Sequence, residues 1–252
     1  MNSMTLKEFF QKHSEVAMAF SGGVDSTYLL YNAIKLGAKV GVYYVKSPFQ
    51  PQLDMDEAVE IGKSLNVRTK IIRIDMLQEE KIVRNAEDRC YQCKSKTFEI
   101  LLKTAAQDGF SMVVDGTNAS DLEENRPGIR ALRELGVRSP LRECGISKEE
   151  IRRFSKEAGL CTWNKPGYSC LATRIQTGEF ITKEKLQRIE KAEQYLYLSG
   201  FSGYRVRMNG SIAKVELQEK QFIMAIERRK EILKELQQYF TSVYLDLEAR
   251  DE

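Results

Sequence analysis

Short apolar runs alternate with helix-like stretches over the first 160 residues of the chain. Runs rich in branched and aromatic residues are typical of buried strands, and they occur at 16–20, 39–45, 69–74 and 111–114. Stretches with apolar residues three and four apart are typical of amphipathic helices, and they occur at 28–36, 54–65, 94–106 and 147–158. This alternation predicts an α/β fold, with a doubly wound parallel sheet and helices on both of its faces.

The pattern changes after residue 160. A loop-like stretch at 161–178 is followed by a helical pattern at 182–198 and by alternating runs at 204–208 and 212–217. Asn209-Gly210 separates these two runs and is a strong hairpin turn. A second helix is predicted at 220–240 and a last strand at 242–247. We therefore expect two domains, an α/β domain over 1–165 and a small α+β domain over 166–252.

Composition and charge narrow the class of protein. The chain has 252 residues, of which 42% are hydrophobic and 30% charged, as in ordinary globular proteins. No apolar run is long enough to span a bilayer and the first residues do not resemble a signal peptide, so we expect a cytoplasmic protein with no membrane partner. The net charge of +3 is too balanced to indicate broad nucleic-acid binding.

The hexapeptide 21–26 lies between the first predicted strand and the first predicted helix. Its glycines, Gly22 and Gly23, let the backbone approach phosphate oxygens closely, and the helix that follows directs its first amides at an anion. Ser21 and Ser26 add hydroxyl donors, and the Asp25 carboxylate can hold a divalent cation such as Mg²⁺. A Walker-type loop would carry a lysine here, and this hexapeptide has none. The alternative is an ordinary tight turn capped by a serine.

Further polar residues follow later strands. Ser47 comes after the second predicted strand, and Gly116 and Thr117 come after the fourth. Because ligands of parallel sheets bind at the carboxyl ends of the strands, we expect these residues to join the hexapeptide in binding ATP and its pyrophosphate portion.

The cysteines are the second chemical signal. Cys90 and Cys93 have a spacing that can clasp one metal or cluster, and Cys170 lies in a later loop. Three cysteines suffice for an iron–sulfur cluster with one open iron, whereas zinc would need a fourth because the chain has one histidine. From spacing alone, a cluster, a zinc site and unrelated thiols all stay open. Cys144 and Cys161 have no partner at ligand spacing.

Together these motifs resemble one family. The ordered stretches are 21–26, 89–94, 115–118, 125–128, 139–141, 163–166, 170–174 and 205–207. The hexapeptide resembles the PP-loop of ATP pyrophosphatases, and the full set resembles the LarE family, the ATP-dependent sulfur transferases of nickel-pincer nucleotide cofactor synthesis, over about residues 5 to 247. The resemblance implies that a carboxylate of pyridinium-3,5-biscarboxylic acid mononucleotide is adenylated, with release of pyrophosphate, and becomes a thiocarboxylate when sulfur displaces AMP.

The family has two sulfur donors. In one style a single cysteine at the position of Cys170 gives up its own sulfur and becomes dehydroalanine. In the other, the C-x-x-C pair joins that cysteine to hold a [4Fe-4S] cluster that carries an extra sulfide. Since this chain has Cys90, Cys93 and Cys170, it resembles the second style, which implies many turnovers and a supply of sulfide from a donor.

The resemblance also implies substrate contacts. Arg205 and Arg207 alternate along a predicted strand, so both face one side and can clamp a phosphate. Arg174 and Glu193 match further substrate positions and Lys94 a catalytic one, although charged residues on helices often form only surface ion pairs. Two weaker candidates for holding a metal are Asp121 and Glu216.

The expected partners are ATP with Mg²⁺, the pyridinium mononucleotide and a sulfide donor, in a homo-oligomer such as a hexamer. The main alternative is an iron–sulfur tRNA thiolation enzyme with a PP-loop, which a strongly basic surface would favour. A PP-loop amidotransferase-like ligase would not need the cysteines. A nucleotide-sensing module with a zinc knuckle would leave the arginine pair and the Cys170 loop unexplained.

Overall fold

The chain forms two compact units, each built from more than one segment. The computed structural model describes residues 4–122, 127–167 and 170–250, so Asn125 and Arg126 of one family-like stretch lie outside the described residues. Unit 1 consists of Met1–Ser47, Gln52–Asp75 and Asp88–Lys165. Unit 2 consists of Pro48–Pro51, Met76–Glu87 and Pro166–Glu252.

Unit 1 contains the predicted parallel sheet. Its strand order is β3-β2-β1-β4, and every neighbouring pair is parallel. The strands are β1 (Glu15–Ala19), β2 (Lys39–Lys46), β3 (Thr69–Arg73) and β4 (Val113–Val114). The order runs outward from β1 in both directions, so β1 and β4 flank the point where the winding reverses. The α/β fold class predicted from the alternating pattern is confirmed.

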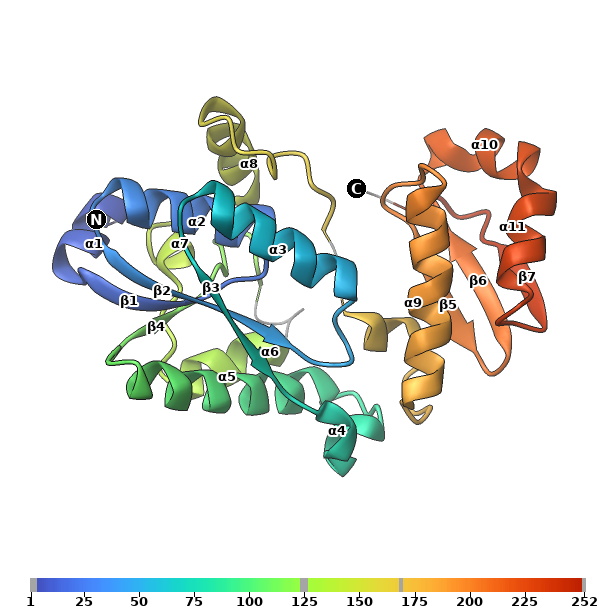
Figure 1. Cartoon of the computed structure of the whole chain (residues 1–252), viewed down its shortest axis with the longest axis horizontal. Coiled ribbons are helices and arrows are strands. Elements are labelled where there is room, and N and C mark those ends of the chain that lie inside the picture. The colour runs from blue at the N-terminus through green and yellow to red at the C-terminus, as the bar shows by residue number, and fades with distance from the viewer. Residues whose placement is uncertain (1–3, 123–126, 168–169, 251–252) are drawn as a thin grey trace. The chain divides into compact units, whose positions relative to one another are not determined.

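Helices cover both faces of this sheet. Helices α2 (Val24–Lys35) and α3 (Gln52–Ser64) lie on one face and α5 (Arg89–Gln107) on the other (Figure 1). Helix α8 (Lys148–Glu157) packs against α2, where the rings of Tyr28 and Phe154 stack with centroids 6.1 Å apart. The buried core between β1, β2 and α2 includes Val16, Met18, Leu29, Leu30 and Val42.

Local signals set the helix ends. Ser147 caps α8 with a complete capping box, in which its hydroxyl accepts from the Glu150 amide and the Glu150 carboxylate accepts from the Ser147 amide. Gly37, just past the end of α2, has a φ of +78°. The apolar pattern did not predict the shorter helices α1 (Leu6–Lys12), α4 (Glu80–Val83), α6 (Pro127–Glu134) and α7 (Pro140–Glu143).

Unit 2 contains a three-stranded mixed sheet of order β5-β6-β7. Strands β5 (Arg205–Asn209) and β6 (Ile212–Glu216) form the predicted antiparallel hairpin around Gly210, whose φ is +57°. Strand β7 (Ser242–Leu245) pairs parallel to β6, and α9 (Lys183–Leu198) packs against β5.

The single helix expected over 220–240 is wrong. The segment divides into a short 3-10 turn η4 (Glu219–Gln221), α10 (Phe222–Glu227) and α11 (Arg229–Leu236). The break falls at Arg228, whose backbone has φ −94° and ψ 12° and whose Nη1 donates to the Ser199 carbonyl at 2.7 Å. This bond satisfies the free carbonyl of the C-cap residue of α9 and ties the break at Arg228 to the end of that helix.

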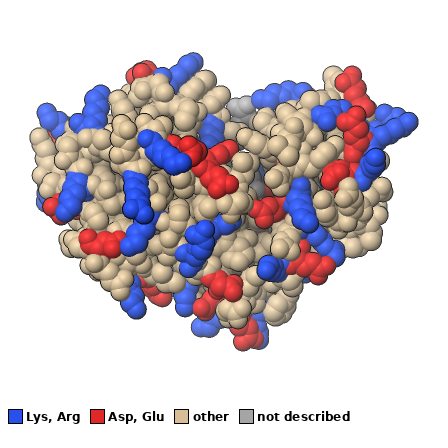
Figure 2. Space-filling view, viewed as in Figure 1, with Lys and Arg blue, Asp and Glu red and all other residues tan. Residues whose placement is uncertain are grey.

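Charged side chains of both signs are mixed over the face of the molecule shown in Figure 2. Within the described ranges, every helix is too short or too polar to cross a bilayer.

Candidate active site

The hexapeptide forms a tight loop between β1 and α2. The hydroxyls of Ser21 and Ser26 lie 3.1 Å apart, and the Ser26 hydroxyl also lies 3.3 Å from the Gly23 carbonyl. Gly23 is the N-cap of α2 and has no side chain to bond the first amides of the helix. The positive end of the helix and its uncapped amides are therefore available to an anion such as a phosphate.

Close packing explains why glycine occupies position 22 of the hexapeptide and position 116 of the loop after β4. Gly22 has a φ of +69°, and a Cβ at this position would lie 2.9 Å from the Cα of Ala58 on α3. A Cβ on Gly116 would lie 3.0 Å from the Ser26 amide nitrogen. The loop after β4 therefore touches the start of α2, at the reversal point of the sheet where ligands of such folds bind.

The other residues predicted to bind ATP are buried or form hydrogen bonds to the protein itself. Ser47, directly after β2, is buried with 4% of its surface exposed. The Thr117 hydroxyl donates to Asp115, whose Oδ1 also accepts from the Ser139 hydroxyl at 2.6 Å. These bonds hold the 115–117 loop in a fixed conformation beside the hexapeptide.

Two lysines from distant parts of the sequence reach the hexapeptide. Lys148 Nζ lies 2.6 Å from Oδ2 of Asp25, and Oδ1 of the same carboxylate accepts from the Asn118 amide group at 3.2 Å. Lys165 Nζ donates to the Gly22 carbonyl at 3.2 Å. The hexapeptide contains no lysine; Lys165 falls within the family-like stretch 163–166, whereas Lys148 lies in none of the family-like stretches.

The C-x-x-C pair lies inside a helix rather than before one, so the helix start expected at residue 94 is wrong. Helix α5 begins at Arg89, which places Cys90 and Cys93 one turn apart on the same side. The Arg89 guanidinium donates to the Cys90 sulfur at 3.3 Å. Lys94 follows, with its Nζ 4.9 Å from the Phe98 ring centroid.

Cys170 belongs to unit 2, so the three cysteines of interest are divided between the two units. Cys170 is half-buried and begins the 3-10 helix η3 (Leu171–Arg174), where its carbonyl accepts from the Thr173 hydroxyl at 2.7 Å. The Leu171 amide donates to the Phe49 carbonyl at 2.8 Å. Within either unit, the described residues contain no group of three histidine, cysteine or acidic side chains placed to hold a metal.

Arg174 and Glu193, both predicted to contact substrate, bind each other. Nε of Arg174 lies 2.7 Å from Oε1 of Glu193, and their side chains are 1% and 4% exposed. The same Glu193 oxygen accepts from the Val206 amide at 2.9 Å. The pair thus joins η3, α9 and β5, and it positions the strand that carries Arg205 and Arg207.

A cluster of arginines gathers at the start of β5. Arg207 forms an ion pair with Glu216 and donates to the Thr173 carbonyl at 3.0 Å, and Arg250 contacts the same glutamate at 3.4 Å. Burial, then Arg174, Arg250 and Arg207, lowers the pKa of Arg205 to about 10. Within the described residues the Arg205 side chain makes no hydrogen bond or ion pair, although the nearby Glu216 carboxylate opposes the lowering of the Arg205 pKa. Sequence patterns missed Arg250, which lies far along the chain in a segment without periodicity.

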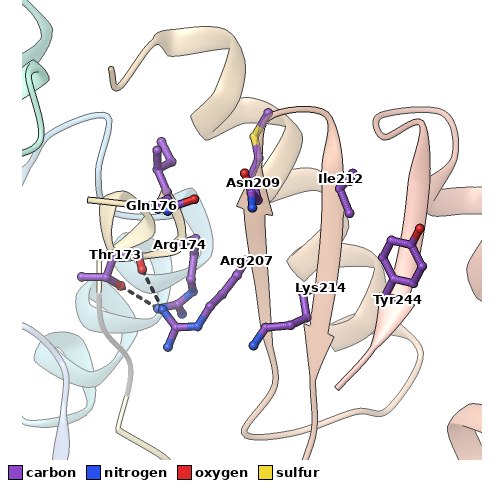
Figure 3. Close-up of a pocket in the computed structure, with 10 residues that line it drawn as sticks. Thr173, Arg174, Gln176, Arg207, Asn209, Ile212, Lys214 and Tyr244 are labelled. Atoms are coloured by element: carbon purple, nitrogen blue, oxygen red, sulfur yellow. Dashed lines mark hydrogen bonds between the residues drawn. The ribbon is translucent and has the colours of Figure 1, made fainter. Parts of the chain in front are cut away.

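A pocket of about 560 Å³ opens beside this cluster. Arg207 and Thr173 line one end, and Lys214 and Tyr244 from β6 and β7 line the other (Figure 3). Guanidinium and ammonium groups that line an open pocket, as those of Arg207 and Lys214 do here, are suited to bind an anion such as a phosphate.

The two weaker metal candidates serve other partners in this structure. An Asp121 carboxylate oxygen accepts from the Asn118 amide at 3.0 Å. Glu216 forms ion pairs with Arg207, Arg250 and Lys214. Burial raises the pKa of Glu216, but Arg207 and Lys214 outweigh it and hold that pKa below the usual value.

Comparison with known proteins places these features in context. The chain is 37% identical to a protein of Synechocystis sp. described as uncharacterized, over 97% of this chain and 92% of that protein. It is 35% identical to an uncharacterized protein of Methanocaldococcus jannaschii, over 96% and 93%. It is 32% identical to the pyridinium-3,5-bisthiocarboxylic acid mononucleotide synthase of Lactiplantibacillus plantarum, over 85% and 79%. No protein-family model matches the chain.

Proposed function

This chain belongs to the LarE-like family of PP-loop ATP pyrophosphatases, and we propose that it is an ATP-dependent sulfur transferase acting on pyridinium-3,5-biscarboxylic acid mononucleotide. The observation that carries the proposal is the similarity to the Lactiplantibacillus plantarum synthase across most of both chains. The PP-loop at the reversal point of the sheet and the arginine cluster of unit 2 support it, because they offer sites for two different phosphate groups.

The first step is activation of a carboxylate. An oxygen of the substrate carboxylate attacks the α-phosphorus of ATP, the bond to the β-phosphate oxygen breaks, and pyrophosphate leaves. The uncapped start of α2 and the hydroxyls of Ser21 and Ser26 are placed to bind the departing pyrophosphate. Asp25 is the carboxylate of this loop that would hold Mg²⁺, since Mg²⁺ is commonly bound through one or two carboxylates and the nucleotide phosphates.

The second step replaces AMP by sulfur. A sulfide attacks the carbonyl carbon of the acyl adenylate, the carbon–oxygen bond to AMP breaks, and a thiocarboxylate forms. Cys90, Cys93 and Cys170 are the thiols that would hold a [4Fe-4S] cluster, which supplies sulfide at its open iron when bound. The position of Cys90 and Cys93 on one side of the first turn of α5 fits such ligation.

The mononucleotide phosphate is assigned to the arginine cluster. Arg205 brings a guanidinium that forms no ion pair within the described residues, and Arg207, two positions along the same strand, lines the pocket. The nearly fully buried Arg174–Glu193 pair keeps β5 in place, so these two residues act on the substrate through the strand that they support.

The test is anaerobic purification with spectra of four cysteine variants. We expect a brown protein whose colour is lost in Cys90→Ala, Cys93→Ala and Cys170→Ala and kept in Cys161→Ala, an exposed cysteine that serves as control. With ATP, Mg²⁺, sulfide and the mononucleotide, we expect more thiocarboxylate than enzyme. A colourless protein that loses one sulfur from Cys170 for each product formed would show the sacrificial style instead, and a protein that thiolates tRNA but not the mononucleotide would overturn the substrate.

A further inference from the structure

The loop that should bind pyrophosphate contains no positive side chain, and the structure supplies two from elsewhere. Lys148 contacts Asp25 of the loop, and Lys165 contacts Gly22. We propose that Lys148 and Lys165 are the cationic ligands of the β- and γ-phosphates of ATP, and therefore of the pyrophosphate that leaves. This inference rests on the ATP chemistry of the proposed function and assigns to it two residues outside the hexapeptide.

A closed ring of hydrogen bonds holds Lys148 at the loop. Its own amide donates to the Ser120 hydroxyl at 3.0 Å, and the Ser120 amide donates to the Asn118 side chain at 2.9 Å. Asn118 in turn donates to Asp25, the carboxylate that Lys148 binds. The backbone of Lys148 is thereby fixed to the loop after β4, and its ammonium group is directed to the start of α2.

The stability of α8 does not explain a lysine at this position. Lys148 is the first residue of α8, where the helix dipole disfavours a positive charge. The side chain stays 36% exposed and its partner Asp25 23% exposed, so their ion pair contributes little to folding. The charge of Lys148 is unfavourable for α8 and is directed at the phosphate-binding loop, so binding of a phosphate explains this lysine better than helix stability does.

Helix α8 also fixes Lys165. Arg152 on α8 donates to the carbonyls of Trp163 at 2.8 Å and of Lys165 at 3.0 Å. From this anchored turn, Lys165 Nζ reaches Gly22 and lies 2.7 Å from Oε2 of Glu57. One helix therefore presents both lysines to the same loop.

Both ammonium groups have N–H donors left to bind a phosphate oxygen while they keep a hydrogen bond to the protein. An ammonium carries three N–H donors, and within the described residues Lys165 has two partners and Lys148 one. If Asp25 held Mg²⁺, its carboxylate would be shared with that cation, and the ammonium of Lys148 would remain beside the phosphates. Lys148 thus neutralises Asp25 before the metal nucleotide arrives.

The test compares binding of Mg²⁺–pyrophosphate, Mg²⁺–ATP and AMP to the full chain by calorimetry. We expect Lys148→Gln and Lys165→Gln each to weaken pyrophosphate and ATP binding about 10- to 100-fold, as loss of a charged hydrogen bond predicts. AMP binding should change less than about twofold, because AMP lacks the phosphates that the lysines contact. Lys63→Gln, at an exposed lysine on α3 that pairs with Glu60, is the control and should leave all three affinities unchanged.

Lys148→Arg and Lys165→Arg keep the charge and should recover part of the pyrophosphate affinity, which a variant that merely unfolds would not. Equal loss of AMP and pyrophosphate binding, or wild-type pyrophosphate affinity in both glutamine variants, would overturn the inference. A protein that binds pyrophosphate through these lysines but makes no thiocarboxylate would contradict the proposed sulfur transfer and leave the lysine assignment standing.

Discussion

Gly22 offers the most direct test of how the phosphate loop is built. Its φ of +69° is a conformation that costs a residue with a side chain about 1–2 kcal/mol. In addition, a Cβ there would lie 2.9 Å from both Cα and Cβ of Ala58. Because one of these atoms is backbone, α3 itself must shift, and such overpacking costs about 1–3 kcal/mol. We therefore expect Gly22→Ala to lower the free energy of unfolding by about 2–5 kcal/mol.

Gly37 provides a matched control at the other end of the same helix. Its φ is +78°, but a Cβ there would have nothing within 4 Å, so Gly37→Ala carries the conformational cost alone. Urea unfolding of both variants without nucleotide isolates the clash as a difference of about 1–3 kcal/mol. Calorimetry with Mg²⁺–ATP should show that Gly22→Ala loses affinity and that Gly37→Ala keeps it. Unfolding free energies within about 0.5 kcal/mol of each other would refute the close approach of the loop to α3.

Three further predictions concern groups away from the loop. Glu193→Ala should lower the unfolding free energy by about 3–5 kcal/mol in urea titrations, because it leaves a buried guanidinium without its counter-charge. Burial raises the pKa of Cys144 to about 11, so at pH 8 iodoacetamide should label it far more slowly than exposed Cys161, as peptide mass spectrometry would reveal; equal rates would contradict the burial. Arg138 lowers the pKa of Glu143, which stabilises the fold above the ordinary glutamate pKa and no longer does so once the pH falls below the folded-state value. The stability lost in Glu143→Gln at pH 7 should therefore shrink as the pH falls below the ordinary glutamate pKa and through the lower folded-state value, and a loss independent of pH would indicate packing instead.

Local sequence patterns predicted the elements whose signals are local. The Asn209-Gly210 turn produced the expected hairpin, and Ser147 with Glu150 marked the start of α8. The apolar runs at 16–20 and 39–45 became adjacent parallel strands because each is buried on a face covered by helices. These cases depend on residues within a few positions of one another.

Features that depend on distant residues were not predictable in this way. The break at Arg228 is stabilised by the carbonyl of Ser199, the C-cap residue of α9. Lys148 and Lys165 reach a loop more than 120 residues earlier in the chain, as the separations of their hydrogen bonds show. The pairing of Arg174 with Glu193 likewise appears only when η3 and α9 are packed together.

The interleaving of the two units along the chain has a consequence for how the protein can be divided. Unit 2 includes Pro48–Pro51 and Met76–Glu87, and its backbone uses them: the amides of Leu171 and Ile181 donate to the carbonyls of Phe49 and Val83. A fragment of residues 166–252 would lack both acceptors and would expose the apolar surface that these segments cover. Unit 2 can therefore form only after the last residues of the chain have been synthesised and joined to segments from the first 87 residues, and neither unit can be taken from the chain as one contiguous fragment.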